Sequence, residues 1–341
     1  MQQKIVANEQ LPPFLQDLLQ PSAYDHEVSQ VELVQTHISY VLLAGAYVYK
    51  IKKPLDFGFL DFTTLAKREY YCHQELNLNR RLCPTIYLEV VPIIKTGPTH
   101  SLGGAGEPVE YAVKMARMPE DAMMGNVIAR GELGREHLDR IIETLEPFYQ
   151  QAATGPAISP YGTSEAVGRN VFENFRQIEP FVGCSALNGE EFQAVSSYAR
   201  NFLQQTDLFN RRVEAGRIRD CHGDLYSANI CLAEQVYIFD CIEFNDRFRY
   251  IDVASDVAFL AMDLDYHGLE ALSVYFIERF TRDTADATLK EILQFYKCYR
   301  ATVRGKIGLL TGHEPEVEPL ARQEALARAA KYFALAQQYA A

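Results

Sequence analysis

The sequence lacks the cysteine spacing of a zinc site or of a disulfide framework. Its seven cysteines are an odd number, and no two of them form a C-x-x-C pair. Structural zinc sites depend on closely spaced thiolate and imidazole ligands. Unpaired thiols are ordinary in a reducing compartment. We therefore expect free, mostly buried cysteines and a cytoplasmic protein.

Long apolar runs and an excess of positive charge are also missing. The longest apolar stretch, YVLLAGAYVY, has about ten residues, whereas a membrane-spanning helix needs about 20. The first residues do not show the basic region and following apolar run that are typical of a signal peptide. The 33 Lys and Arg residues are outnumbered by 45 Asp and Glu residues, for a formal net charge of -12. Nucleic acids and membrane surfaces are polyanionic, so we expect neither as a partner. A local basic site for a nucleotide phosphate is compatible with this charge.

The chain is long enough for two lobes, and its first part is rich in β-type segments. It has 341 residues, of which 48% are hydrophobic. Within residues 28–118, alternation and breaks predict five antiparallel strands. They are VELVQTH, SYVLLAG, AYVYKIKKP, YLEVVPII and VEYAVKMARM. Between the third and the fourth, TTLAKREYYCHQELNLNRRL predicts one helix, which Pro84 ends.

After Pro119 the apolar spacing is near 3.6, which predicts helices. Only two short β-like pieces, NICLA and VYIFD, interrupt this pattern. The sequence therefore predicts an α+β chain with a five-stranded antiparallel sheet and one inserted helix in its N-terminal lobe. We expect an N-terminal arm over residues 1–27, a nucleotide-binding N-lobe over 28–118 and a helical C-lobe over 119–341. The C-lobe would carry the catalytic loop and bind the substrate.

The stretch HGDLYSANI concentrates polar side chains between two apolar segments. Asp224 precedes Asn229, and Asp240 ends the β-like segment that follows. A carboxylate can accept a hydrogen bond from an attacking hydroxyl, and an amide oxygen with a second carboxylate suits Mg²⁺. A hairpin would bring these three positions to the same end. The alternative is a turn capped by Asx side chains.

This spacing resembles the protein-kinase pattern H-x-D-x-x-x-x-N followed by a metal-binding aspartate. With glycine in the middle position, and with IFDCIEF downstream, the chain resembles the aminoglycoside phosphotransferase group of small-molecule kinases. These share a two-lobe protein-kinase-like fold with the choline kinases, and the resemblance covers most of residues 30–310. It implies that Asp224 is the catalytic base or orients the acceptor, and that Asn229 and Asp240 hold Mg²⁺. It also implies that ATP is the donor and that His222 is structural.

The nucleotide side of such a site needs a cation for the phosphates. Lys50 follows Val48 at the kinase spacing, and Lys52 is the runner-up on the same strand face. In the resembling enzymes this lysine pairs with a glutamate on the inserted helix. Glu75 lies in the middle of an apolar face, where a carboxylate needs a partner, whereas Glu69 lies at the edge of that face. We therefore favour Glu75 and leave Glu69 as the alternative.

Other polar residues have weaker assignments. The turn QTHIS, at the position of the kinase Gly-rich loop, has no glycine, so Thr36, His37 and Ser39 are only weak candidates for phosphate contacts. In RYIDVASDVAFL, Asp252 is expected to cap a helix. The resemblance implies that Asp256 braces the catalytic loop from within the fold.

The leading hypothesis is an ATP- and Mg²⁺-dependent enzyme that moves the γ-phosphate to a hydroxyl of a small molecule. One alternative is a protein kinase, although the segment after Asp240 lacks D-F-G and A-P-E. Two others are an AMP-transferring enzyme and a non-catalytic nucleotide-binding regulator. Glu243 and Asp246 could face the substrate or a second metal. Together with Asp263 and Asp265 they could suit a cationic acceptor. The sequence predicts neither the acceptor nor the oligomeric state.

Overall fold

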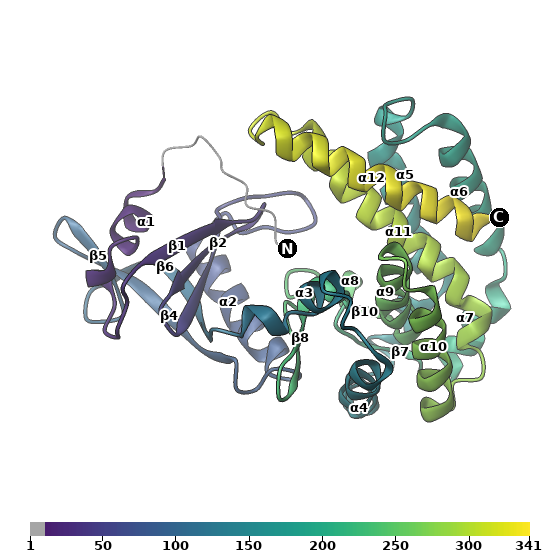
Figure 1. Cartoon of the computed structure of the whole chain (residues 1–341), viewed down its shortest axis with the longest axis horizontal. Coiled ribbons are helices and arrows are strands. Elements are labelled where there is room, and N and C mark those ends of the chain that lie inside the picture. The colour runs from purple at the N-terminus through teal and green to yellow at the C-terminus, as the bar shows by residue number, and fades with distance from the viewer. Residues whose placement is uncertain (1–10) are drawn as a thin grey trace. The chain divides into compact units, whose positions relative to one another are not determined.

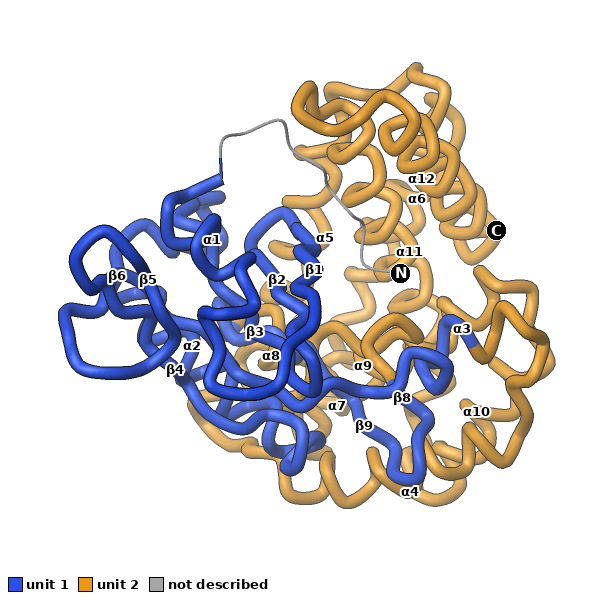
Figure 2. Tube along the Cα trace, turned by 60° about the vertical axis from the view of Figure 1, so that its left-hand side comes forward, with its two compact units in different colours: residues 1–126, 231–246 blue, residues 127–230, 247–341 orange. Residues whose placement is uncertain are grey.

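The computed structural model describes residues 11–341, which form two compact units (Figures 1 and 2). Among these residues, unit 1 comprises 11–126 and 231–246, and unit 2 comprises 127–230 and 247–341. This division differs from the predicted one, which ended the first lobe at residue 118 and gave 231–246 to the helical lobe. The later segment belongs to unit 1 for two reasons. Cys231 forms an isolated antiparallel β-bridge with Met123, and the Cys83 thiol donates to the Ile238 carbonyl at 3.1 Å.

Unit 1 is built on an antiparallel sheet in the order β1-β2-β3-β6-β4-β5. The strands are β1 (Val31–Gln35), β2 (Ser39–Ala44), β3 (Tyr47–Lys52), β4 (Tyr87–Thr96), β5 (Thr99–Leu102) and β6 (Glu107–Ala116). The five predicted strands are present, but the count was wrong because the Gly-rich turn contains β5. Gly97, with φ of +61°, makes the tight reversal between β4 and β5, a conformation that glycine adopts without strain.

One helix, α2 (Leu65–Asn79), is inserted between β3 and β4 as predicted. The Thr64 hydroxyl caps it by accepting the Lys67 N–H at 3.3 Å. Its inner face carries Cys72 and Leu76 together with polar residues that are just as buried, Glu75 and Asn79. Buried polar side chains need partners, so this face is the first place to look for a site.

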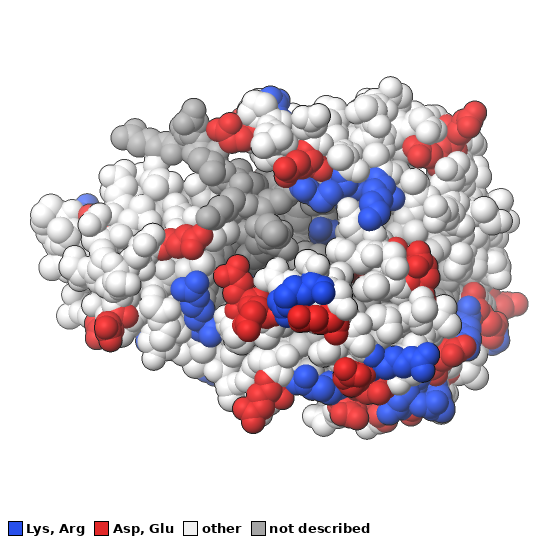
Figure 3. Space-filling model, in the orientation of Figure 1, with Lys and Arg blue, Asp and Glu red and all other residues white. Residues whose placement is uncertain are grey.

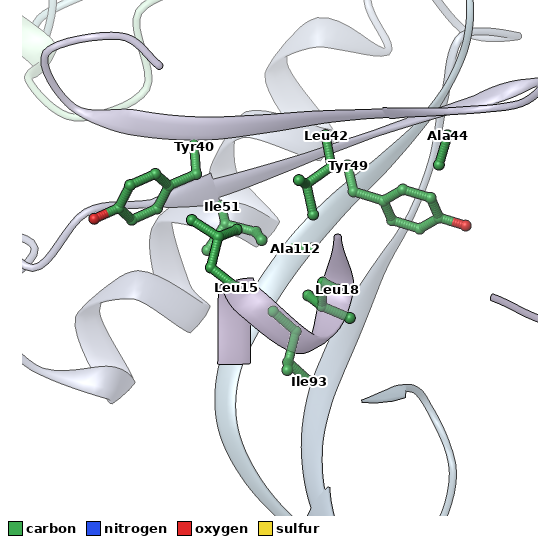
Figure 4. Packing of buried hydrophobic residues seen from close by; sticks show 9 residues of the cluster. All are labelled: Leu15, Leu18, Tyr40, Leu42, Ala44, Tyr49, Ile51, Ile93 and Ala112. Carbon is green, nitrogen blue, oxygen red and sulfur yellow. The ribbon is translucent and has the colours of Figure 1, made fainter. Parts of the chain in front are cut away.

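The described part of the N-terminal segment, before the sheet, packs within unit 1. It holds α1 (Pro13–Leu18) and the short 3-10 turn η1 (Pro21–Ala23). Leu15 and Leu18 are fully buried in one cluster with strand residues such as Leu42 (Figure 4). Removing these side chains from water favours the packed arrangement. The first ten residues of the predicted arm lie outside the described residues.

Unit 2 is mainly helical, as the periodicity predicts, with α3 and α8 at the division between the units. Its helices are α3 (Met124–Ala129), α4 (Arg135–Gln151), α5 (Ser164–Ile178), α6 (Gly189–Phe202), α7 (Thr206–Glu214), α8 (Asp246–Arg249), α9 (Val253–Tyr266), α10 (Glu270–Thr284), α11 (Leu289–His313) and α12 (Pro319–Ala340). Helix α9 is buried along nearly its whole length, which explains its apolar composition on all sides. Among the described residues, no helix is long and apolar enough to cross a membrane.

Two short strand pairs frame the HGDLYSANI segment. Strand β7 (Ile218–Asp220) pairs with β10 (Tyr250–Asp252), and β8 (Ile230–Leu232) pairs with β9 (Val236–Ile238). The segment is thus the connection between β7 and β8. On the molecular face in Figure 3, acidic and basic side chains are interspersed.

Helix α9 begins at a buried ion cluster. Asp252 caps the helix by accepting the Ala254 N–H at 2.8 Å, as expected. Its carboxylate also accepts the Arg212 Nε–H at 2.8 Å, and Arg212 pairs with Asp286 as well. Arg212 is fully buried, so these carboxylates compensate a charge that would otherwise be costly there.

Candidate functional site

In unit 1, two lysines of β3 meet one glutamate of α2. Lys50 and Lys52 point to the same side of the strand because they are two residues apart. Lys50 Nζ lies 2.8 Å from Glu75 Oε1, and Lys52 Nζ lies 2.7 Å from Glu75 Oε2. The structure therefore places Glu75 beside both lysine candidates, whereas Glu69 interacts with Tyr111.

The two contacts to Glu75 differ in quality. The Lys52 contact is a directed hydrogen bond, whereas the Lys50 contact lacks hydrogen-bond geometry and is an ion pair. Glu75 is 0% exposed, so both of its oxygens are withdrawn from water and depend on these ammonium groups.

Asp240 joins this group from the end of β9. Lys50 Nζ donates to Asp240 Oδ1 at 2.5 Å. The Asp240 side chain keeps 30% of its surface exposed, the largest fraction in the group. Its backbone has φ of +65°, which costs a non-glycine residue about 1–3 kcal/mol, although aspartate tolerates it better than most. Tyr87 and Asn79 hold this turn by bonding the N–H groups of Asp240 and Cys241, at 3.3 and 2.9 Å.

The group extends to a fifth member. Lys52 also pairs with Glu243, three positions after Asp240 in the sequence. The result is an ion-pair chain in the order Asp240, Lys50, Glu75, Lys52 and Glu243, with two ammonium groups between three carboxylates. Glu243 is buried and bonded within unit 1, so the structure does not show it facing a substrate.

The charges of this chain shift one another's pKa. Burial opposes ionisation of Glu75, but the two lysines outweigh burial and lower the pKa of that carboxyl to about 2. Burial likewise opposes the charge of Lys50, yet Asp240 and Glu75 raise its pKa well above the ordinary lysine value. Burial raises the pKa of Glu243 despite its pairing with Lys52. Glu243 is therefore expected to take up a proton before Glu75 as the pH falls.

The QTHIS turn is a closed hairpin turn between β1 and β2. Thr36 Oγ1 accepts the N–H groups of Ile38 and Ser39 at 3.3 and 3.0 Å, and Ser39 is fully buried. The Thr36 side chain thus stabilises the turn itself, and His37 lies in the same turn.

In unit 2, helix α9 holds the connection between β7 and β8. Asp256 accepts the backbone N–H groups of His222 and Gly223, each at 2.9 Å. Further along the same helix, Asp263 accepts the Ser227 N–H at 2.9 Å. The fully buried Asp256 therefore has the bracing contacts that the resemblance implied.

The loop brings Asp224 and Asn229 into direct contact. Asn229 Nδ2 donates to the Asp224 carbonyl at 3.0 Å and to Asp224 Oδ2 at 2.9 Å. This fixes the amide so that its oxygen is turned away from Asp224. The Asp224 N–H donates to Nδ1 of the buried His222 at 3.3 Å, a contact within the loop.

The donor atoms available fit a magnesium ion. Asn229 of unit 2 has an amide oxygen and Asp240 of unit 1 has a carboxylate, and each is an oxygen donor of the kind that Mg²⁺ prefers. Among the described residues, no group of three or more His, Cys, Asp and Glu side chains could hold a metal.

Two arginines of α11 were missed in the sequence. Arg300 Nη1 donates to the Gly223 carbonyl at 3.0 Å, and its Nε donates to Ser255 at 3.2 Å. One turn later, the Arg304 guanidinium lies 4.5 Å from the ring centroid of Tyr226. The i, i+4 spacing of two arginines within an otherwise largely buried helix was the available signal.

The acidic residues suggested for a cationic acceptor have internal partners. Glu243 pairs with Lys52, and Asp263 accepts the Ser227 N–H. Asp265 pairs with Lys297 and accepts the Tyr339 hydroxyl. A cationic acceptor therefore gains no support from these three carboxylates.

Lys306 of α11 is expected to titrate near neutrality. Its Nζ donates to two neutral oxygens, of Asn174 at 2.6 Å and Gln177 at 2.9 Å, and burial lowers its pKa to about 8. Because the unfolded chain holds this proton more tightly, stability should rise as the pH increases from about 8 to 10.5. NMR of ¹³C-methylated lysines should show a midpoint near pH 8 for one resonance, absent from Lys306→Arg. A midpoint at the ordinary value of 10.5 would contradict this.

No protein-family model matches the chain. Among curated proteins, the uncharacterized protein Rv2004c of Mycobacterium tuberculosis is 34% identical over 282 residues, which cover 81% of this chain and 54% of that protein. The uncharacterized protein Mb2027c of Mycobacterium bovis matches with the same values. The chain therefore spans about half the length of these curated relatives.

Comparison with solved structures identifies the fold. The GDP and kanamycin complex of APH(2")-IIIa matches with a TM-score of 0.56 at 11% identity, covering 95% of this chain and 99% of that one. The chain has the fold of the aminoglycoside phosphotransferases. The amicoumacin kinase hAmiN in complex with AMP-PNP and Ca²⁺ matches with a TM-score of 0.51 at 13% identity, covering 91% of this chain and 90% of that one. The protein-kinase-like fold predicted from HGDLYSAN and IFDCIEF is thus confirmed.

Proposed function

We propose that this aminoglycoside phosphotransferase-like chain transfers the γ-phosphoryl group of ATP, with Mg²⁺, to a hydroxyl of a small molecule. The observation that carries the proposal is the Lys50–Glu75 pair with Asp240 on the same lysine. The solved relatives in fold were obtained with GDP and kanamycin, and with AMP-PNP, which supports a nucleotide-dependent transfer to a small molecule.

Each residue has a defined task in this reaction. Lys50 binds phosphate oxygens while Glu75 holds its ammonium in place. Asn229 and Asp240 would hold Mg²⁺, which would neutralise charge on the phosphates. The acceptor oxygen forms a bond to the γ-phosphorus as the bond from that phosphorus to the bridging oxygen of ADP breaks. Asp224 accepts the hydrogen bond of the attacking hydroxyl and receives its proton.

The contacts of Asp224 support this task. Asn229 Nδ2 holds one carboxylate oxygen, Oδ2, at 2.9 Å, so the carboxylate is oriented before a substrate arrives. Asp224 is also partly exposed, which is compatible with contact to a substrate.

The segment after Asp240 argues against a protein kinase. Helix α8 begins at Asp246, so only residues 241–245 separate it from Asp240. A protein kinase needs a long activation segment at this place. A small-molecule acceptor therefore suits the chain better.

The proposal is tested by a screen for ATP consumption over hydroxylated metabolites and aminoglycosides, with ADP release as the readout. We expect at least one acceptor to stimulate ADP release by the wild-type chain and not by Asp224→Asn. Equal stimulation of both proteins by every active compound would overturn the assignment of Asp224.

A further inference from the structure

Lys52 is enclosed to a degree that a phosphate-binding lysine is not. Its side chain is 1% exposed, against 12% for Lys50. Its ammonium contacts Glu75 and Glu243 and lies 4.9 Å from the ring centroid of Phe62. These contacts surround the charge, so Lys52 holds carboxylates of its own unit. The ion-pair chain thus has an open end, at Lys50 and Asp240, and a closed end, at Lys52 and Glu243.

Loading of a nucleotide changes the partners at the open end. This step rests on the proposed function, in which Lys50 turns to phosphate and Asp240 turns to Mg²⁺. Their mutual contact at 2.5 Å must then be given up. Glu75 would then share the Lys50 ammonium with phosphate and so lose part of its compensation, and a buried carboxylate with an incomplete partner is strongly disfavoured.

The closed end supplies the missing compensation. Lys52 keeps a directed hydrogen bond to Glu75 Oε2 at 2.7 Å that does not involve Lys50. Glu243 holds Lys52 and is tied to Asp240 through a short stretch of chain. Within this stretch, Asn79 accepts the Cys241 N–H at 2.9 Å. The segment that carries Asp240 is therefore anchored on both β3 and α2.

We propose that Lys52 and Glu243 are a positioning pair for nucleotide binding. They keep the charge of Glu75 compensated and the Asp240 segment anchored while the contact between Lys50 and Asp240 is replaced. In this exchange Lys50 would bind phosphate and Asp240 would bind the metal. Neither residue touches the nucleotide. Their effect is on the affinity for the metal–nucleotide complex.

The test compares stability with nucleotide affinity in neutral variants. Lys52→Met alone leaves Glu243 without its cation, so its melting temperature should fall. In Lys52→Met/Glu243→Gln neither charge of this pair remains, so part of the stability should return, whereas the loss at Glu75 Oε2 persists because this oxygen still lacks Lys52. Its Kd for Mg·AMP-PNP, measured by calorimetry, should still be about 10-fold weaker or more, the loss typical of residues that support a metal ligand.

A matched control is the exposed pair Lys67 and Asp61 of the same unit, with side chains 44% and 39% exposed. Lys67→Met/Asp61→Asn should leave both the melting temperature and the Kd unchanged. Glu243→Gln, which retains the bond between Lys52 and Glu75, serves if the double variant does not fold. Its Kd should also be weakened.

Three results would overturn the inference. A folded double variant with the wild-type Kd would show that the pair is only structural. An unchanged Kd in folded Glu243→Gln would do the same if the double variant fails to fold. A wild-type chain that does not bind Mg·AMP-PNP would overturn the proposed function as well, so the two failures are distinguishable.

Discussion

Replacing Asp224 with asparagine is expected to lower kcat by about 10²- to 10⁴-fold, the usual contribution of a positioned acid or base. The amide has nearly the same shape, and its oxygen can still accept from Asn229 Nδ2, so the loop geometry should persist. It cannot take the proton of the attacking hydroxyl. Steady-state ADP release with the acceptor found by the screen measures the loss.

Binding should be preserved in this variant, because Asp224 is not assigned to the nucleotide. The Kd for Mg·AMP-PNP is therefore expected to remain within about twofold of the wild-type value. Asp207→Asn, at an exposed position of α7, is a matched control that should keep full turnover. A kcat of Asp224→Asn equal to that of this control would remove Asp224 from the mechanism.

Replacing Asp240 with asparagine should abolish the contribution of Mg²⁺ to nucleotide binding. The amide is a poorer ligand for a hard cation than a carboxylate is, so we expect the Kd for Mg·AMP-PNP to weaken by about 10- to 100-fold or more. Asparagine also tolerates the positive φ of +65° at this position, so the turn itself should survive.

The measurement is calorimetry of AMP-PNP with Mg²⁺ and with excess chelator. In the wild-type chain the metal should strengthen binding, whereas in Asp240→Asn the two values should converge. Asp61→Asn, at an exposed carboxylate of unit 1, controls for the loss of one negative charge. An undiminished effect of Mg²⁺ in Asp240→Asn would show that the metal is held elsewhere.

Much of unit 1 could be predicted from sequence because its signals are local. Alternation, turn residues and the stop at Pro84 predicted the main strands and the inserted helix. The burial argument gave Glu75, since a carboxylate inside an apolar helix face needs a cation. Strand β5 was missed because it is short and lies in a Gly-rich stretch whose composition is typical of a loop.

The rest depends on contacts between distant parts of the chain. Nothing in IFDCIEF indicates that Glu243 reaches Lys52, 191 positions away in sequence. Likewise, the contact of Arg300 with Gly223 spans 77 positions. The prediction also weighed Lys50 against Lys52, whereas the structure uses both on the two oxygens of one carboxylate. Spacing in the sequence can rank Lys50 above Lys52 as a partner of Glu75, but it does not show that both lysines bind the same carboxylate.

The central claim is tested most directly by identifying the product that the wild-type chain makes from its acceptor and ATP. Mass spectrometry of the acceptor, after incubation with ATP labelled at the γ-phosphate, reports which group has moved. We expect one added phosphoryl group that carries the label, with ADP as the other product. An acceptor that gains an adenylyl group, or ATP that is hydrolysed with no modified acceptor, would contradict it.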